Sequence, residues 1–202
     1  MSVERPVVEV RDLGPDEQTA FAAALARGMR DNPMNVAVFG EDPDRRHRRL
    51  EWVFSTLFRV MTDQVPLVAI DDGIVVGGTG VALPGTCQPT TTQRLRFLPG
   101  TLALGPATAA RMVRWLGAWG AKDLGEPHVH LGPLAVDAHL QGRGIGTQIL
   151  QQHCRRLDEH QLVGYLETDK EVNVRLYQRH GYQVIGEGPV LGVRCWYMRR
   201  PA

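Results

Sequence analysis

A glycine-rich turn between an apolar strand and a helix constrains this chain more than any other feature. An apolar segment ends at Leu134–Val136, and the turn Gln141–Thr147 follows it and opens a helix. Unpaired backbone N–H groups at such a helix start point to one spot, and the helix dipole favours an anion there. Glycine lets the backbone approach a pyrophosphate without an intervening Cβ. The turn therefore predicts an anion-binding site.

Three phosphate-binding patterns compete for this turn. The dinucleotide fingerprint G-x-G-x-x-G fails, because its last position falls on Thr147 or Ile149. The Walker pattern fails because no Gly-Lys-Ser/Thr follows the glycines. The pattern Q-x-x-G-x-G remains, beginning at Gln141. The alternative is a structural turn whose glycines only permit tight packing.

The pattern Q-x-x-G-x-G resembles the acetyl-CoA pyrophosphate loop of the GCN5-related N-acetyltransferase superfamily. A second segment, with Glu167, Asn173, Tyr177 and Gly181, also resembles that superfamily. Asn173 and Tyr177 are four residues apart and so share a helix face. The resemblance implies that Asn173 approaches the cofactor and that Tyr177 gives a proton to the departing thiolate of coenzyme A. The alternative for Tyr177 is a core tyrosine with a satisfied hydroxyl.

A proline inside an otherwise good strand marks the region before the turn. Gly132-Pro133 predicts a bulge or an edge, because proline donates no ladder hydrogen bond. The resemblance implies that this strand bulges and splays from its neighbour, so that the thioester arm of the cofactor enters the split. The predicted cofactor-binding residues are Leu134, Ala135, Val136, Gln141, Gly142, Arg143, Gly144, Ile145, Gly146, Thr147 and Asn173.

Two residues compete for the role of general base. His130 lies where some relatives carry a glutamate base, and a histidine titrates near neutral pH. Glu167, at the end of the next strand, is its rival, acting directly or through water. His128-x-His130 suggests a metal, but no third ligand stands at suggestive spacing, so we expect no metal. The three cysteines show no CxxC; Cys154 lies on a predicted helix, and Cys87 and Cys195 have no neighbouring histidine at recognisable spacing. We therefore expect buried apolar roles for them and direct transfer without a cysteine intermediate.

Periodicity and turn residues predict the order of elements. We expect strands at 7–10, 66–70, 74–78, 128–136, 163–167, 182–185 and 195–199, and helices at 14–32, 42–61, 106–119, 144–159 and 173–180. Met112, Val113 and Leu116 should face inward, and residues 84–105 should form loops. The order argues for an α/β or α+β sheet covered by helices. The resemblance implies that this is a single α/β (α+β) N-acetyltransferase domain over 1–202, with a mixed, mostly antiparallel sheet flanked by helices. Its acetyl-CoA core spans roughly 128–200, and its acceptor-side elements span roughly 15–62 and 84–127.

Composition excludes several classes of protein. The 202 residues carry a net charge of +1, which argues against nucleic acid or an anionic membrane as partner. The basic cluster at 45–49 is expected to be a solvated helix face. The chain shows neither an apolar stretch of membrane-spanning length nor a signal-peptide core, so we expect a cytoplasmic protein. A homodimer stays an open prediction.

The expected function is transfer of an acetyl group from acetyl-CoA to a primary amine of a small molecule, such as an amine-bearing antibiotic or metabolite. The layout and the ending 196–200 resemble puromycin N-acetyltransferase-like bacterial proteins. Three alternatives stay open: acetylation of a protein or peptide amine, a non-catalytic acyl-CoA-binding or regulatory module, and a structural α/β domain.

Overall fold

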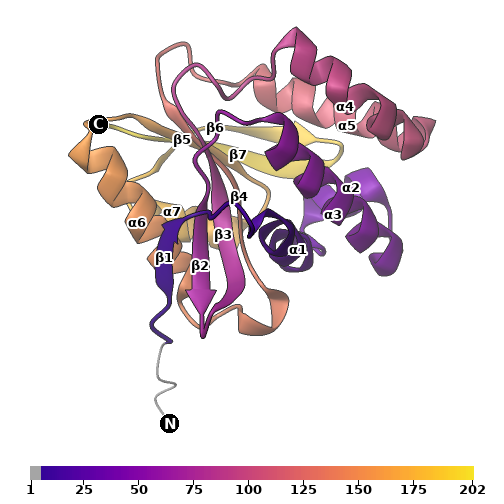
Figure 1. Cartoon of the computed structure of the whole chain (residues 1–202). Helices are drawn as coiled ribbons and strands as arrows, with labels where there is room; N and C mark the ends of the chain where they lie inside the picture. Colours follow the sequence, from indigo (N-terminus) through magenta and orange to yellow (C-terminus); the bar gives the residue numbers. More distant parts are fainter. Residues whose placement is uncertain (1–5) are drawn as a thin grey trace.

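A seven-stranded sheet lies between two layers of helices in the computed structural model, which describes residues 6–202 (Figure 1). The strands are β1 (Glu9–Asp12), β2 (Leu67–Asp71), β3 (Ile74–Ala82), β4 (Val129–Val136), β5 (Gly164–Thr168), β6 (Gln183–Val190) and β7 (Val193–Arg200). Their order is β1-β2-β3-β4-β5-β7-β6, and β4 with β5 is the one parallel pair among the described strands. The predicted mixed, mostly antiparallel sheet is confirmed.

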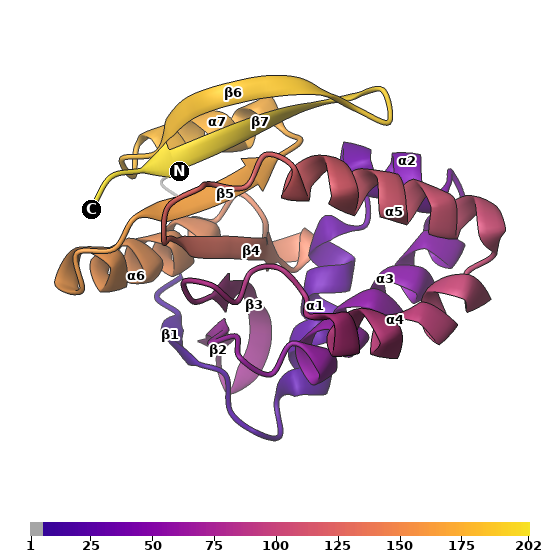
Figure 2. The ribbon, with the colours of Figure 1, turned by 90° about the horizontal axis from the view of Figure 1, so that it is seen from above.

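The helices divide unequally between the two faces of the sheet. They are α1 (Gln18–Met29), α2 (Pro33–Phe39), α3 (Pro43–Val60), α4 (Thr91–Ala103), α5 (Pro106–Gly120), α6 (Ile145–Glu159) and α7 (Glu171–Gln178), with a short 3-10 turn η1 (Ala138–Leu140). Helices α6 and α7 cover one face, and α1 to α5 lie on the other (Figures 1 and 2). Neighbouring strand residues therefore serve different cores: Tyr165 packs toward α1–α5 and Leu166 toward α6 and α7.

The predicted helix from Asp42 is confirmed, and Asp42 caps its start. The Asp42 carboxylate accepts hydrogen bonds from the amides of Asp44 and Arg45, and Pro43 occupies the first turn. The prediction of a solvated basic face is wrong at Arg46, which is 4% exposed. Its guanidinium donates to the carbonyls of Arg30 and Gly40 and to a carboxylate. That side chain fastens α3 to the end of α1.

Two helices lie where none was predicted. Helix α1 ends at Met29, before the predicted end at Asn32-Pro33, and Pro33 starts α2, because proline suits the first helical position. Residues 91–103 form α4, whose start is a capping box between Thr90 and Gln93. The prediction of loops there missed this helix. Helix α4 contains Pro99 and has no buried residue, so it shows weak apolar periodicity.

Helix α5 confirms the predicted helix over 106–119, but not its expected inner face. Met112 is buried, whereas Val113 is 67% exposed and Leu116 is 55% exposed. Helix α4 also carries exposed leucines, namely Leu95, Leu98 and Leu102. Within residues 6–202, none of the helices has the length and hydropathy needed to cross a bilayer.

The central feature for function is a fork between β4 and β5. The two strands pair only at Val129 with Gly164 and at His130 with Tyr165. Beyond that point β4 stays on β3 and β5 stays on β7, so the two strands separate (Figure 2). Gly132 and Pro133 fall in a register shift opposite β3, which confirms the predicted bulge.

Candidate active site

The glycine turn presents a run of free backbone donors. Gly142 and Gly144 have φ of 79° and 89°, a left-handed conformation that glycine adopts without steric cost. Among residues 6–202, none accepts a hydrogen bond from the five consecutive amides at 142–146. The hydrogen-bonded turns of α6 begin with the amides of Thr147 and Gln148, which donate to the Gly144 carbonyl. The turn thus has the free N–H groups and the helix start that an anion site needs.

The Gln141 side chain forms hydrogen bonds to the rest of the protein, which hold the turn in place. Its side-chain amide donates to the carbonyl of Gly28 in α1 at 2.9 Å and to the carbonyl of Val136 in β4 at 3.0 Å. One side chain therefore joins the turn, the end of β4 and α1. We interpret Gln141 as a clamp that holds the shape of the turn, while Arg143 is exposed at its tip.

The end of β4 provides the second part of the site. Ala135 and Val136 are buried, and Leu134 packs against the core under α6 and α7. One edge of this segment pairs with β3, and the other edge faces the fork, where β5 has already diverged. A strand edge left without a neighbour can pair with an extended ligand through its backbone groups. The fork and the glycine turn lie at the same end of β4.

Tyr177 and Asn173 approach from the helix that follows β5. Both lie on α7, which confirms the predicted helix, and Asn173 is half-buried. Tyr177 is 5% exposed and belongs to the same core cluster that Leu134 packs against. Burial, followed by the nearby charge of Asp169, raises the pKa of Tyr177 well above its usual value. The hydroxyl is therefore a neutral donor at any physiological pH.

His130 and Glu167 form a pair on the other face of the sheet. His130 Nε2 lies 2.8 Å from Glu167 Oε2, and the Glu167 side chain is 4% exposed. Burial by itself lowers the pKa of His130, but the Glu167 carboxylate and Cys87 together raise it by more, so the net shift is upward. The two candidates for the base, treated as rivals in the sequence, are thus in direct contact.

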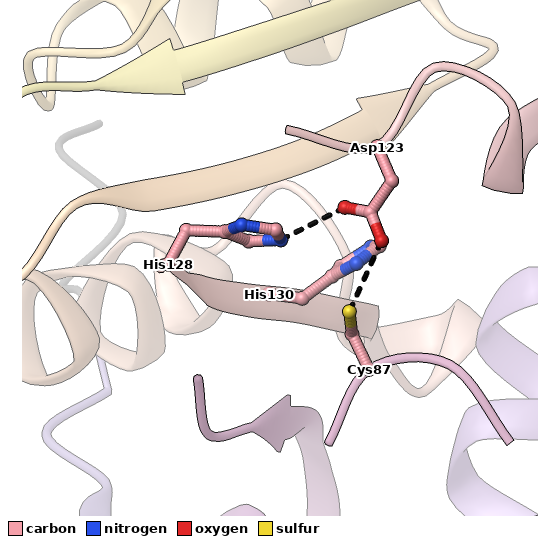
Figure 3. A group of neighbouring side chains, drawn as sticks. All are labelled: Cys87, Asp123, His128 and His130. Atoms are coloured by element: carbon pink, nitrogen blue, oxygen red, sulfur yellow. Dashed lines mark hydrogen bonds and ion pairs between the residues drawn. The ribbon is translucent and has the colours of Figure 1, made fainter. Parts of the chain in front are cut away.

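The expectation of a buried apolar role is wrong for Cys87, which is half-buried among polar side chains. Cys87 and Asp123, from two separate loops, lie beside His128 and His130 (Figure 3). Cys87 Sγ is 3.1 Å from one carboxylate oxygen of Asp123, and His128 Nε2 is 2.9 Å from the other. Cys154 and Cys195 are buried, as expected. Residue spacing carries no signal for this group, because Cys87 and Asp123 are 36 positions apart.

Comparison with known proteins agrees with this architecture. A sequence profile of the acetyltransferase (GNAT) family matches residues 32–182. The chain belongs to this family. No curated protein sequence matches the chain, so the comparison does not single out the puromycin N-acetyltransferase-like group.

Several solved structures share the fold across nearly the whole chain. A Corynebacterium glutamicum protein described as histone acetyltransferase HPA2 and related acetyltransferase has 21% identity and a TM-score of 0.73, covering 96% of this chain and 97% of its own. Arylalkylamine N-acetyltransferase 2 from Aedes aegypti has 14% identity and a TM-score of 0.66, with coverages of 96% and 98%. Polyamine N-acetyltransferase from Drosophila melanogaster has 17% identity and a TM-score of 0.62, with coverages of 97% and 100%.

Proposed function

We propose that this protein transfers the acetyl group of acetyl-CoA to a primary amine of a small molecule, by direct attack and in the cytoplasm. The observation that carries the proposal is the run of five free amides at 142–146 beside the open fork of β4 and β5. Free amides at a helix start suit the pyrophosphate of coenzyme A. The open edge of β4 at Leu134–Val136 suits the extended arm that carries the thioester.

Each chemical step has a residue suited to it. The amine nitrogen attacks the thioester carbonyl carbon, the carbon–sulfur bond breaks, and coenzyme A leaves as a thiolate. Tyr177 gives that thiolate a proton, which a buried neutral phenol can do. Asn173, one helical turn earlier on α7, contacts the cofactor. Backbone donors of β4 stabilise the oxyanion of the tetrahedral intermediate.

The proton of the amine goes to Glu167 in this proposal, and His130 is a positioning residue. Both assignments rest on geometry. The Nε2 side of His130 faces the Glu167 carboxylate, and its Nδ1 side faces Cys87 and Asp123 rather than the fork. Glu167 lies within the stretch of β5 that has left β4. Its carboxylate, held by the imidazole, is therefore the nearer of the two to an amine in the fork.

A small amine is the acceptor class that we propose. The acceptor side is the face of the sheet under α1–α5, where Trp115 and Trp119 pack edge to face with ring centroids 5.2 Å apart. Their indole N–H groups are buried and have no partner among the described residues. Aromatic faces attract ammonium groups. Two of the structural neighbours are named for their action on polyamines and arylalkylamines, and that class is our first choice here.

A release assay for coenzyme A thiol tests the proposal. We expect release with some members of an amine panel of polyamines, arylalkylamines, amine-bearing antibiotics such as puromycin, amino acids and peptide N-termini. Glu167→Gln should lower kcat by about 100-fold, the scale of a lost general base, and leave the affinity for acetyl-CoA unchanged. Glu171→Gln, at an exposed position of α7, is the control. If calorimetry detects no acetyl-CoA binding at millimolar ligand, the proposal fails.

A further inference from the structure

The group of Cys87, Asp123, His128 and His130, called here the Cys87 cluster, is built from three separate segments. Cys87 lies in the loop between β3 and α4, Asp123 follows α5, and the two histidines stand at the start of β4 (Figure 3). One ligand atom from each residue lies within 4.8 Å of the other three. Sulfur, imidazole nitrogen and carboxylate oxygen thus converge on one point, at the edge of the acceptor side.

Each imidazole turns one nitrogen away from the cluster and one nitrogen toward it. His128 Nδ1 lies 2.8 Å from the carbonyl of Glu126, and because a carbonyl only accepts, this nitrogen carries the proton. His130 Nε2 lies 2.8 Å from the Glu167 carboxylate and carries its proton for the same reason. A metal ion binds the neutral rings, in which the remaining nitrogens, Nε2 of His128 and Nδ1 of His130, present lone pairs to the cluster.

Those two nitrogens are buried and lack a partner. Neither makes a hydrogen bond to any residue that the structure describes. The His128 side chain is only 5% exposed. A buried nitrogen without a partner costs roughly 1–3 kcal/mol, and two in one place call for an explanation.

The contacts inside the cluster bring electron-rich atoms close together, as in a cation-binding site. When His128 is neutral and its proton is on Nδ1, the Nε2 lone pair faces a carboxylate oxygen of Asp123 at 2.9 Å, and the two atoms repel unless a proton or a metal ion lies between them. The other Asp123 oxygen is 3.1 Å from Cys87 Sγ. A divalent cation at the centre removes the repulsion and satisfies all four groups.

We propose that the Cys87 cluster binds one Zn²⁺ ion with all four residues as ligands. Zinc prefers tetrahedral sites of sulfur, nitrogen and oxygen atoms at about 2.0–2.3 Å. Thiolate and imidazole disfavour Mg²⁺ and Ca²⁺, which take oxygen ligands. The outer contacts also fit, since metal-bound histidines donate their second N–H to a carboxylate or a carbonyl, as His130 does to Glu167 and His128 to Glu126.

The proposed ion has a structural role, because the protein fills all four positions of the tetrahedron. It ties both ends of the α4–α5 segment to β4, since Cys87 precedes α4 and Asp123 follows α5. It also holds His130 in the tautomer that donates to Glu167. The site adjoins the proposed base through His130, but measuring metal binding tests the site separately from acetyl transfer.

Metal analysis of the full-length protein, purified without a histidine tag, tests the site. After chelation and reconstitution we expect one zinc per chain, and a melting temperature that falls on chelation and recovers with Zn²⁺. The cobalt-substituted protein should show the thiolate-to-cobalt charge-transfer band and the visible bands of a tetrahedral site. Cys87→Ser should abolish the charge-transfer band and weaken zinc binding by at least about 100-fold.

Two further variants keep the test decisive. Cys154→Ser, at a buried cysteine on α6, is the matched control and should keep the band and the zinc. Asp123→Asn should weaken zinc binding while retaining the charge-transfer band, even if Cys87→Ser does not fold. Reconstituted protein without metal, or a band unchanged in Cys87→Ser, would overturn the proposal. An acetylated Cys87 in the mass spectrum after acetyl-CoA treatment would overturn it too, because the thiol would then be a nucleophile.

Discussion

The two proposed ligand sites, the glycine turn and the Cys87 cluster, are built in opposite ways. The turn offers five backbone amides from one continuous segment, in an exposed loop. The cluster offers four side chains from three segments, with Cys87 36 positions away from Asp123, at a partly buried place. Backbone donors follow from local conformation, whereas convergent side chains require that distant elements have already packed.

This difference teaches which substitutions each region tolerates. In the turn, side-chain identity matters little except where it decides φ, so the glycines are the sensitive positions. In the cluster, the identity of each side chain is the site itself. The proposed catalytic residues lie between the two regions, with Tyr177 on the face under α6 and α7 and Glu167 on the face under α1–α5.

The largest expected effect tests whether the turn works through its backbone. Gly144→Val places a β-branched residue at a φ of 89°, where the strain is about 1–3 kcal/mol. The turn should rearrange and lose at least two amide contacts to the pyrophosphate, so acetyl-CoA affinity should fall by about 1000-fold in calorimetry. Gly146→Ala is the control, because its Cβ would meet only ordinary contacts with Val136 and Leu134. Equal losses in both variants would mean that the conformation at Gly144 is not the cause.

A substitution at Tyr177 tests whether its hydroxyl acts as the general acid. Tyr177→Phe removes only a hydroxyl, so kcat should fall by about 100-fold while the affinity for acetyl-CoA stays unchanged. Steady-state kinetics and calorimetry on one preparation separate the two quantities. Tyr182→Phe removes a hydroxyl from the same core, where it contacts His153, and should reduce stability rather than turnover. A Tyr177→Phe enzyme with near-normal kcat would make Tyr177 a core residue.

The buried His153 on α6 makes the stability of the protein sensitive to acid. Burial, reinforced by the charges of Arg200 and Arg156, lowers the pKa of His153 to about 4 from an ordinary 6.5. The unfolded chain therefore binds this proton first as the pH falls. The stabilisation is complete above pH about 6.5 and is lost between about 6.5 and 4, amounting to about 2 kcal/mol by pH 5.

Denaturant unfolding at pH 7 and pH 5 measures this effect. His153→Gln should reduce the difference in unfolding free energy between the two pH values, because the substituted side chain does not titrate. His160→Gln, at an exposed position just after α6, should leave the difference as it is in the wild type. An unchanged pH dependence in His153→Gln would assign the acid sensitivity to other groups.

The smallest expected effect concerns Gln141, whose side chain holds the glycine turn against its neighbours. Gln141→Ala removes the clamp between the turn, Gly28 and Val136, at a cost of about 1 kcal/mol because water can reach the freed carbonyls. The affinity for acetyl-CoA should fall by about fivefold, with a small decrease in melting temperature. Gln151→Ala, at an exposed position of α6, is the control. A loss of 100-fold would instead indicate that Gln141 contacts the ligand directly.

Elements controlled by neighbouring residues were predictable from the sequence. The cap at Asp42, the bulge at Gly132-Pro133 and the turn after β4 each depend on chemistry within a few residues. The same holds for the shared face of Asn173 and Tyr177 on α7. The prediction missed helix α4 because none of its residues is buried. Such a helix lacks the apolar periodicity by which a helix is recognised in a sequence.

The sequence by itself therefore determined the class of fold and the strand, turn and helix at 134–147, because these follow from local conformation and periodicity. Only the tertiary structure decided that His130 pairs with Glu167, which is 37 residues away, and that Cys87 and Asp123 meet two histidines. Those contacts arise when β4, β5 and the loops around α4 and α5 pack together. The spacing of these residues along the chain does not predict the contacts, because packing brings residues together regardless of their distance in the sequence.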